Sequence, residues 1–146
     1  METYLDRYRL LGLTGGSMTE SQIDALSESI GHPLPSSYRA YLSLAGNSPP
    51  PNLVGSDCYG HYLPLLHEWA VELLAECNNP FVLPKNAVVI LMHQGYQFFY
   101  FIADGDRSDP EIYYYYEGKP SAERAYDTFT DWVRAVALSS PDENAP

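Results

Sequence analysis

Three short apolar runs between residues 87 and 117 constrain the fold of this chain more than any other feature. The runs are AVVILM, YQFFYFIA and EIYYYYEG, and the turn sequences HQG and DGDRSDP separate them. AVVILM is apolar on both faces, as expected of a strand in the middle of a sheet. The turns are short enough to join neighbouring strands as hairpins. We therefore predict a three-stranded antiparallel meander over about residues 87–117.

Helical signals lie on both sides of these runs. Four segments combine apolar periodicity with helix start and stop residues, namely 19–31, 35–46, 64–77 and 127–140. Thr19 or Ser21 can cap the first segment, and Gly31 can end it. Between the second and third segments, NSPPPNLVGSDCYG is expected to be irregular because its prolines lack backbone donors.

This order of elements predicts the fold class and the domain organisation. Helices on either side of a meander indicate an α+β fold in which an antiparallel sheet packs against N-terminal and C-terminal helices. The length of 146 residues suits one domain. We expect a single domain over residues 1–146, with a core over about 19–138 and a frayed tail over 139–146.

The charge of the chain limits the classes of partner. Nineteen acidic and eight basic side chains give a net charge of −11, which argues against binding to nucleic acid or to an anionic membrane. Two interpretations of this acidity stay open: it keeps the protein soluble, or it attracts a basic partner. The acidic ladder Glu68, Glu72 and Glu76 is most simply the solvated face of a helix, since like charges four residues apart do not stabilise it.

The cysteines and the apolar runs indicate the compartment. Cys58 and Cys77 form no CxxC motif, so a disulfide framework or a zinc knuckle is not expected. The apolar runs are too short to span a bilayer, and the N-terminal residues do not have the layout of a signal peptide. We therefore predict a cytoplasmic protein with two reduced thiols.

The four consecutive tyrosines suggest a recognition surface. Side chains alternate along a strand, so Tyr113 and Tyr115 share one face while Tyr114 and Tyr116 share the other. One pair is expected in the core and the other pair exposed, and sequence does not say which. Tyrosine is enriched at binding hot spots, and carboxylates beside it suit a lysine- or arginine-rich partner.

The candidate partner-binding residues follow from this reasoning. They are Asp104, Asp106, Asp109, Glu111, Tyr114 and Tyr116, with a second group of Asp57, Tyr59 and Tyr96. The second group is included because the loop before the third helix and the turn between the first two strands could border the same sheet edge. An ordinary solvated turn is the alternative for DGDRSDPE, and a calcium loop fails because the glutamate register does not match.

No sequence motif supports catalysis or a cofactor. GxxxxGK[ST], GxGxxG and GxSxG do not occur in the chain, and the His67-Glu68 pair lacks the second histidine of HExxH. A metal site made by His61, His67 and His93 with Asp57 or Cys58 is conceivable, but scattered histidines rarely converge in this way. We expect no enzyme activity, no metal and no cofactor.

Several segments taken together resemble the SUKH superfamily, which includes the fungal cell-wall-assembly regulator domain and many bacterial immunity proteins. The resemblance covers about residues 19–136. Its residues are Ile30-Gly31, Leu34-Pro35-Ser36-Ser37-Tyr38-Arg39, Leu42, Ala45-Gly46-Asn47, Gly55-Ser56-Asp57, Leu83-Pro84, His93-Gln94-Gly95-Tyr96, Asp109-Pro110, Tyr115-Tyr116-Glu117-Gly118 and Phe129 to Val133. Their order and spacing carry the similarity. His32-Pro33 departs from the usual acidic or small residues of the family and leaves the subfamily open.

The resemblance implies a function as well as a fold. Such domains are α+β and non-catalytic, and bacterial members commonly neutralise a cognate polymorphic toxin, often a nuclease. A nuclease needs a basic cleft for nucleic acid, which an inhibitor with a charge of −11 could occupy. The first hypothesis is therefore an immunity protein that binds a basic protein toxin. The second is a regulatory adaptor or peptide-binding module of the cell-wall-assembly regulator kind.

Overall fold

A four-stranded antiparallel sheet separates two groups of helices in a computed structural model, which describes residues 3–53 and 55–138. The helices are α1 (Tyr4–Leu10), α2 (Glu20–Ile30), α3 (Ser36–Ala45), α4 (Leu63–Glu76) and α5 (Phe129–Trp132), and a π-helical turn over Val133–Ala137 continues α5. The strands are β1 (Ala87–His93), β2 (Gln97–Ile102), β3 (Ile112–Tyr116) and β4 (Glu123–Tyr126). The predicted α+β fold and its meander are confirmed, and the tail predicted over 139–146 lies outside the described residues.

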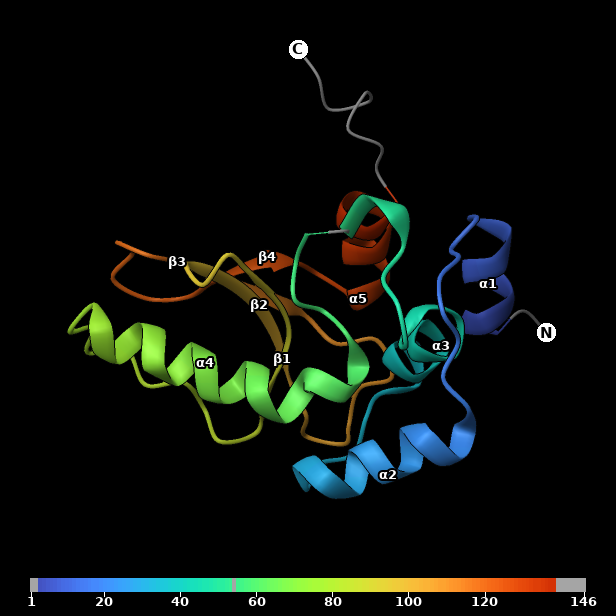
Figure 1. Ribbon diagram of the computed structural model, residues 1–146, viewed down its shortest axis with the longest axis horizontal. Helices are drawn as coiled ribbons and strands as arrows, with labels where there is room; N and C mark the ends of the chain where they lie inside the picture. The colour runs from blue at the N-terminus through green and yellow to red at the C-terminus, as the bar shows by residue number, and fades with distance from the viewer. Residues whose placement is uncertain (1–2, 54, 139–146) are drawn as a thin grey trace, which may run out of the picture.

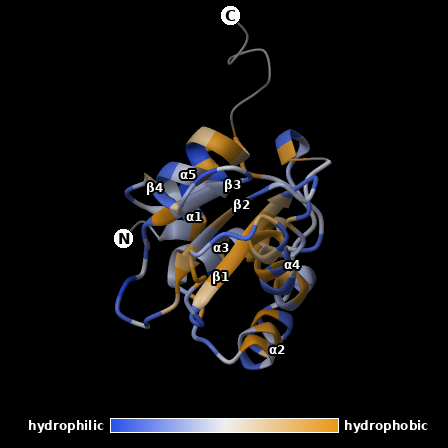
Figure 2. Ribbon diagram, turned by 90° about the vertical axis from the view of Figure 1, so that its left-hand side faces the viewer, coloured by the Kyte–Doolittle hydropathy of each residue, from blue (hydrophilic) through white to orange (hydrophobic). Residues whose placement is uncertain are grey.

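Helices cover both faces of the sheet (Figure 1). Figure 2 shows α4 on one side of the strands, with α1 and α5 on the other. Neighbouring residues of β2 point to opposite sides, as in any strand. Phe101 packs against Tyr38 of α3 and Phe99 against Trp132, with ring centroids 5.3 Å and 5.9 Å apart. Phe98, in contrast, packs against Tyr115, whose hydroxyl accepts a hydrogen bond from Asn79 just after α4.

β1 lies at the edge of the sheet, so the prediction that AVVILM is a central strand was wrong. The hydrogen-bonded order is β1-β2-β3-β4. Residues 87–92 are nevertheless all buried, because helices cover both faces and the backbone of Asp57 bridges to Met92 along the outer edge. An apolar run therefore reports burial of both faces, and it does not report the number of neighbouring strands.

β4 extends the predicted three-stranded meander by one short strand. Its sequence is ERAY, and the first three of its residues are exposed. It pairs with β3 through Tyr113 opposite Arg124 and Tyr114 opposite Glu123. A strand with little buried surface shows no apolar alternation, which is why the sequence pattern did not indicate it.

The helix limits follow local capping chemistry. The hydroxyl of Thr19 accepts the backbone N–H of Gln22, and the Gln22 side chain accepts the N–H of Thr19, which completes a capping box. Gly31 ends α2 with φ of 74°, a left-handed conformation that favours glycine. Both predicted signals are confirmed. The seven-residue helix α1 was not predicted, although Thr3 and Asp6 form the same kind of capping box.

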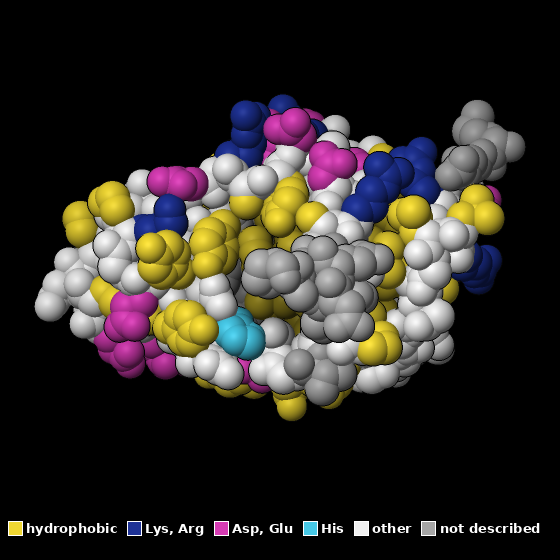
Figure 3. Space-filling view, turned by 90° about the horizontal axis from the view of Figure 1, so that it is seen from above, with side chains coloured by type: hydrophobic (Ala, Val, Ile, Leu, Met, Phe, Trp, Pro, Cys, Tyr) yellow, Lys and Arg dark blue, Asp and Glu magenta, His cyan; other side chains and the backbone are white. Residues whose placement is uncertain are grey.

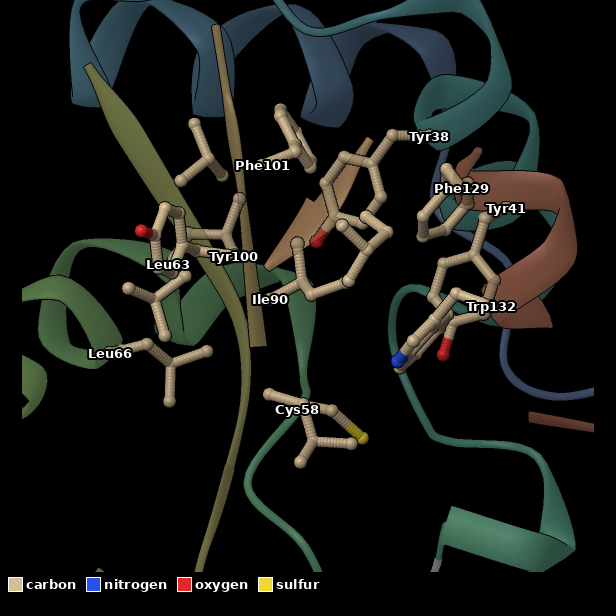
Figure 4. Close-up of a cluster of buried hydrophobic side chains, with 14 of the residues drawn as sticks. Tyr38, Tyr41, Cys58, Leu63, Leu66, Ile90, Tyr100, Phe101, Phe129 and Trp132 are labelled. Carbon is tan, nitrogen blue, oxygen red and sulfur yellow. The ribbon is translucent and has the colours of Figure 1, made fainter. Parts of the chain in front are cut away.

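Aromatic rings from α3, β2 and α5 make the centre of the core (Figure 4). Tyr38 lies 5.3 Å from both Phe101 and Phe129, in edge-to-face geometry. Tyr41 contacts Phe129 at 5.6 Å and Trp132 at 6.0 Å, measured between ring centroids. Such pairs add about 0.5–1.5 kcal/mol each beyond the area that they bury. They hold the short helix α5, which could not persist alone, against α3.

The tyrosine run of β3 does not divide into one buried pair and one exposed pair. Tyr115 is fully buried and Tyr116 is 44% exposed, while Tyr113 and Tyr114 are half-buried. The amide of Asn79, just after α4, donates to the Tyr115 hydroxyl at 3.0 Å. Both faces of β3 therefore contribute to the core, and exposure depends on the position along the strand as well as on the face.

Candidate functional site

The acidic turn, defined as residues 104–111, joins β2 to β3. The carboxylate of Asp104 accepts the backbone N–H of Asp106 at 2.9 Å, which closes a local turn. The carboxylate of Asp109 accepts the backbone N–H of Thr130 at 2.9 Å, at the start of α5. Asp104 and Asp106 are exposed, whereas Asp109 is half-buried and anchors the turn to the helix. Only the first two have carboxylates directed to solvent.

Glu111 is half-buried, and its carboxylate is paired with neighbouring side chains of the same molecule. Its carboxylate accepts hydrogen bonds from the hydroxyl of Tyr113 and from Arg107, each at 3.0 Å, and the guanidinium of Arg124 lies 3.8 Å away. Hydrogen bonds from Tyr113 and Arg107 lower the pKa of Glu111, and the charges of Arg107 and Arg124 act in the same direction. Two guanidinium groups thus offset much of the negative charge at this end of the turn.

Two exposed tyrosines and one half-buried tyrosine lie at the other end of β3. The tyrosine cluster consists of Tyr96, Tyr114 and Tyr116. The rings of Tyr114 and Tyr116 are 6.1 Å apart, and the backbone carbonyl of Tyr96 accepts the N–H of Glu117 at 2.8 Å. Four steps along β3 cover about 13 Å, so the cluster does not adjoin the acidic turn. The tyrosine that contacts the turn is Tyr113, through Glu111.

Two polar residues that sequence reasoning did not identify position this cluster. The hydroxyl of Tyr114 donates to the side-chain carbonyl of Gln97, and partial burial is the main reason that the pKa of Tyr114 is raised. The ammonium of Lys119 lies 5.4 Å from the centroid of Tyr116 and pairs with Glu123 at 2.9 Å. The pairing of β2 with β3 decides the first contact, which no local signal could have indicated. The second is local, since Lys119 follows Tyr116 in a turn and its N–H donates to the Tyr116 carbonyl at 3.1 Å.

The second group of predicted residues lies beside the β1 edge. The N–H of Asp57 donates to the carbonyl of Met92 at 2.8 Å, and the N–H of Met92 donates back at 2.9 Å. The ring of His93 lies 2.9 Å from the Ser56 hydroxyl and 5.8 Å from the ring of Tyr96. The loop before α4 and the β1–β2 turn therefore border one sheet edge.

Tyr59 lies two residues after Asp57 in this loop. Its ring packs against Tyr62 at 5.3 Å, and Tyr62 lies 6.4 Å from Trp69 of α4. In the view from above (Figure 3), hydrophobic side chains, tyrosines included, stand next to acidic and basic ones at the left end of the molecule. Hydrophobic and charged side chains thus share this end of the molecule.

The histidines do not converge. His67 donates through Nδ1 to the carbonyl of Ala87 at 3.1 Å, His93 contacts Ser56, and His61 packs on Tyr62. Among residues 3–53 and 55–138, no three histidine, cysteine or acidic side chains come together as a metal site. Burial, with the nearby charge of Asp57, raises the pKa of the Cys58 thiol to about 12. A thiol held protonated in this way is a poor nucleophile.

Comparison with known proteins gives a family. The model of the SMI1 / KNR4 family (SUKH-1) matches residues 17–135, most of the chain. No curated protein matches the sequence. Within the part of the chain that the structure describes, no helix has the length and apolar character needed to cross a bilayer.

Proposed function

The chain belongs to the SMI1 / KNR4 family (SUKH-1), and from this premise we propose that it is an immunity protein, which neutralises a cognate toxin by binding it. Membership supports a non-catalytic domain of the immunity or cell-wall-regulator kind. The choice of the immunity kind rests on charge. With nineteen acidic and eight basic residues, the protein suits a partner of opposite charge.

The proposed partner is a basic protein, the toxin domain itself. A toxin that cuts nucleic acid needs lysine and arginine along its substrate cleft, and an acidic protein can block that cleft by charge complementarity. The exposed carboxylates of Asp104 and Asp106 and the exposed rings of Tyr96 and Tyr116 are available for such contacts. They would provide steering and anchoring respectively.

The same proposal assigns roles to the other candidate residues. Tyr114, Asp57 and Tyr59 extend the aromatic and acidic surface at the end of the sheet. Asp109 and Glu111 hold the acidic turn in shape through Thr130 and Arg107. We further propose that residues 1–146 act as a single domain in the cytoplasm, with no cofactor.

Affinity capture tests this function. The tagged protein is incubated with lysate of its source at low and at high salt, and retained proteins are identified by mass spectrometry. One basic partner, retained at low salt and weakened at high salt, is the expected result because screening acts on charge pairing. A double variant, Asp104→Asn with Asp106→Asn, should slow association and flatten its salt dependence without loss of folding. Absence of a partner at either salt would overturn the proposal.

A regulatory adaptor is the second candidate, because the matching family model also bears the name of the SMI1 / KNR4 regulators. An adaptor would bind several proteins or peptides, with weaker affinity for each. Capture of several unrelated proteins, in place of one basic partner, would favour this function.

A further inference from the structure

A groove of about 390 Å³ lies between the C-terminal half of α4 and the edge of β1. Three apolar side chains line it, Trp69, Leu73 and Met92, together with the acidic residues Asp57, Glu72 and Glu76. Other cavities on the described residues measure about 250, 230 and 210 Å³. Volumes above about 300 Å³ are typical of ligand sites, so this groove is large enough for a long side chain of a partner.

The walls of the groove are held in place before any ligand binds. Asp57 exchanges two backbone hydrogen bonds with Met92, at 2.8 Å and 2.9 Å, which ties its loop to β1. Leu73 and Met92 are 4% and 1% exposed. Trp69 is half-buried, with its ring 6.4 Å from that of Tyr62. A preformed site loses little conformational entropy when a ligand enters.

The carboxylates of the groove have no partner inside the described part of the molecule, unlike Glu111 and Asp109 of the acidic turn. Glu111 pairs with Arg107, and Asp109 accepts a backbone N–H. Among the described residues, no ion pair or side-chain hydrogen bond involves the carboxylates of Asp57, Glu72 or Glu76. The described ion pairs are made elsewhere, by Arg39, Arg107, Lys119 and Arg124. The groove therefore keeps its negative charge unbalanced.

These glutamates also act against the helix that carries them. Glu72 and Glu76 are separated by one turn, a like-charge spacing that destabilises a helix. Glu76 is the last residue of α4, and no basic residue lies in the last turn. Negative charge at a helix C-terminus opposes the helix dipole and destabilises the helix. A cation bound in the groove would relieve both effects.

We propose that this groove receives an arginine side chain of a basic protein partner. The guanidinium stacks on Trp69 and pairs with Glu72 and Glu76, while Asp57 faces it from the β1 side. Arginine fits better than lysine because its planar, weakly hydrated cation both stacks on aromatic rings and pairs with more than one carboxylate. Its alkyl stem lies along Leu73 and Met92. This inference rests on the proposed function, and it places the main contact between the protein and its basic partner in this groove.

A peptide titration tests the proposal without the natural partner. The probe is acetylated, amidated hexa-arginine, and the signal is tryptophan fluorescence. Trp69 borders the groove, whereas Trp132 is only 1% exposed and should not respond. Hexa-lysine of equal charge is the control peptide. We expect hexa-arginine to change the emission at low salt and to bind at least about fivefold more tightly than hexa-lysine.

Two double variants with equal change of charge locate the site. Glu72→Gln with Glu76→Gln should weaken hexa-arginine binding about tenfold, since two charge pairs with the guanidinium group are lost. Glu20→Gln with Glu28→Gln, on the exposed face of α2, should weaken it less than about twofold because only distant charge is lost. The groove variant should be no less stable than the parent protein, because it removes a like-charge pair.

Several results would overturn the inference. Equal losses in the two double variants would mean that net charge alone attracts the peptide. A larger loss in the Asp104→Asn and Asp106→Asn variant would place the contact at the acidic turn. Equal affinity for hexa-lysine would exclude stacking on Trp69. If a captured basic partner binds the groove variant normally, the groove is rejected as the contact and the proposed function is kept. If hexa-arginine binds in the groove but no partner is captured, the groove is kept as an arginine site and the proposed function is rejected.

Discussion

Replacing Tyr41 with phenylalanine should raise the free energy of unfolding. The hydroxyl of Tyr41 is buried and has no hydrogen-bond partner among the described residues. Burial raises the pKa of Tyr41 well above its ordinary value, so the hydroxyl stays protonated. An unpaired buried hydroxyl costs about 1–3 kcal/mol. Phenylalanine keeps the ring contacts with Tyr38, Phe129 and Trp132, and we therefore expect a gain of about 1 kcal/mol.

Tyr8 provides the matched control, since its hydroxyl is also buried but has a partner. It shares a hydrogen bond of 2.9 Å with the hydroxyl of Thr130, which is itself 4% exposed. Tyr8→Phe deletes this bond and leaves the hydroxyl of Thr130 without it. The expected loss is about 1–2 kcal/mol. The same substitution, at two buried tyrosines, should thus change stability in opposite directions.

Urea unfolding at neutral pH measures both effects. With a slope of about 2 kcal/mol per molar urea, a gain of 1 kcal/mol moves the midpoint by roughly 0.5 M. The melting temperature should rise by about 2–4 °C. A Tyr41→Phe variant that is less stable than the parent, with an unchanged slope, would refute the reasoning, because the hydroxyl would then be hydrogen-bonded in solution.

Three further predictions concern reactivity, pH and a turn. Iodoacetamide at pH 8 should modify half-buried Cys77 and spare buried Cys58, because burial raises the pKa of the Cys58 thiol to about 12. In urea both thiols should be modified, and mass spectrometry counts the modified cysteines. Because the pKa of Glu111 is lower in the folded state than in the unfolded state, its contribution to stability is present above the ordinary glutamate pKa and is lost as pH falls through the folded value. The urea midpoint of the Glu111→Gln variant should therefore lie below that of the parent protein at pH 7, and the two midpoints should approach each other at pH 3. An equal difference between the midpoints at the two pH values would contradict this. Gly31→Ala should lower the unfolding free energy by about 1 kcal/mol, because φ is 74° there, and thermal unfolding would detect the change.

Most of the architecture could be predicted from local patterns. Thr19, one of the two predicted caps, begins α2 and Gly31 ends it as expected, since both signals depend only on neighbouring residues. The three long strands followed from their apolar and aromatic runs. β4 has few buried side chains, and α1 is short, so neither produced a periodic signal strong enough to recognise.

The candidate site could be predicted only in part. The chemistry was visible in advance, as carboxylates and tyrosines near one another in the chain. Their grouping was not visible, because strand β3 separates the acidic turn from Tyr116, and Arg124 reaches Glu111 only through the pairing of β3 with β4. The glutamates of α4 had the simplest interpretation of a solvated face, yet Glu72 and Glu76 line a groove.

The sequence by itself determined the order of helices α2 to α5 and strands β1 to β3, the positions of the turns between these strands, the excess of negative charge and the resemblance to a family. These properties depend on residue type and on spacing over a few positions. Only the tertiary structure decided which tyrosines are exposed and which carboxylates are paired with a distant cation, as Glu111 is with Arg124. It also placed Asp57 across a groove from Glu72 and Glu76. Packing decides these relations, because it brings together residues that are far apart in the chain and excludes water from some of them.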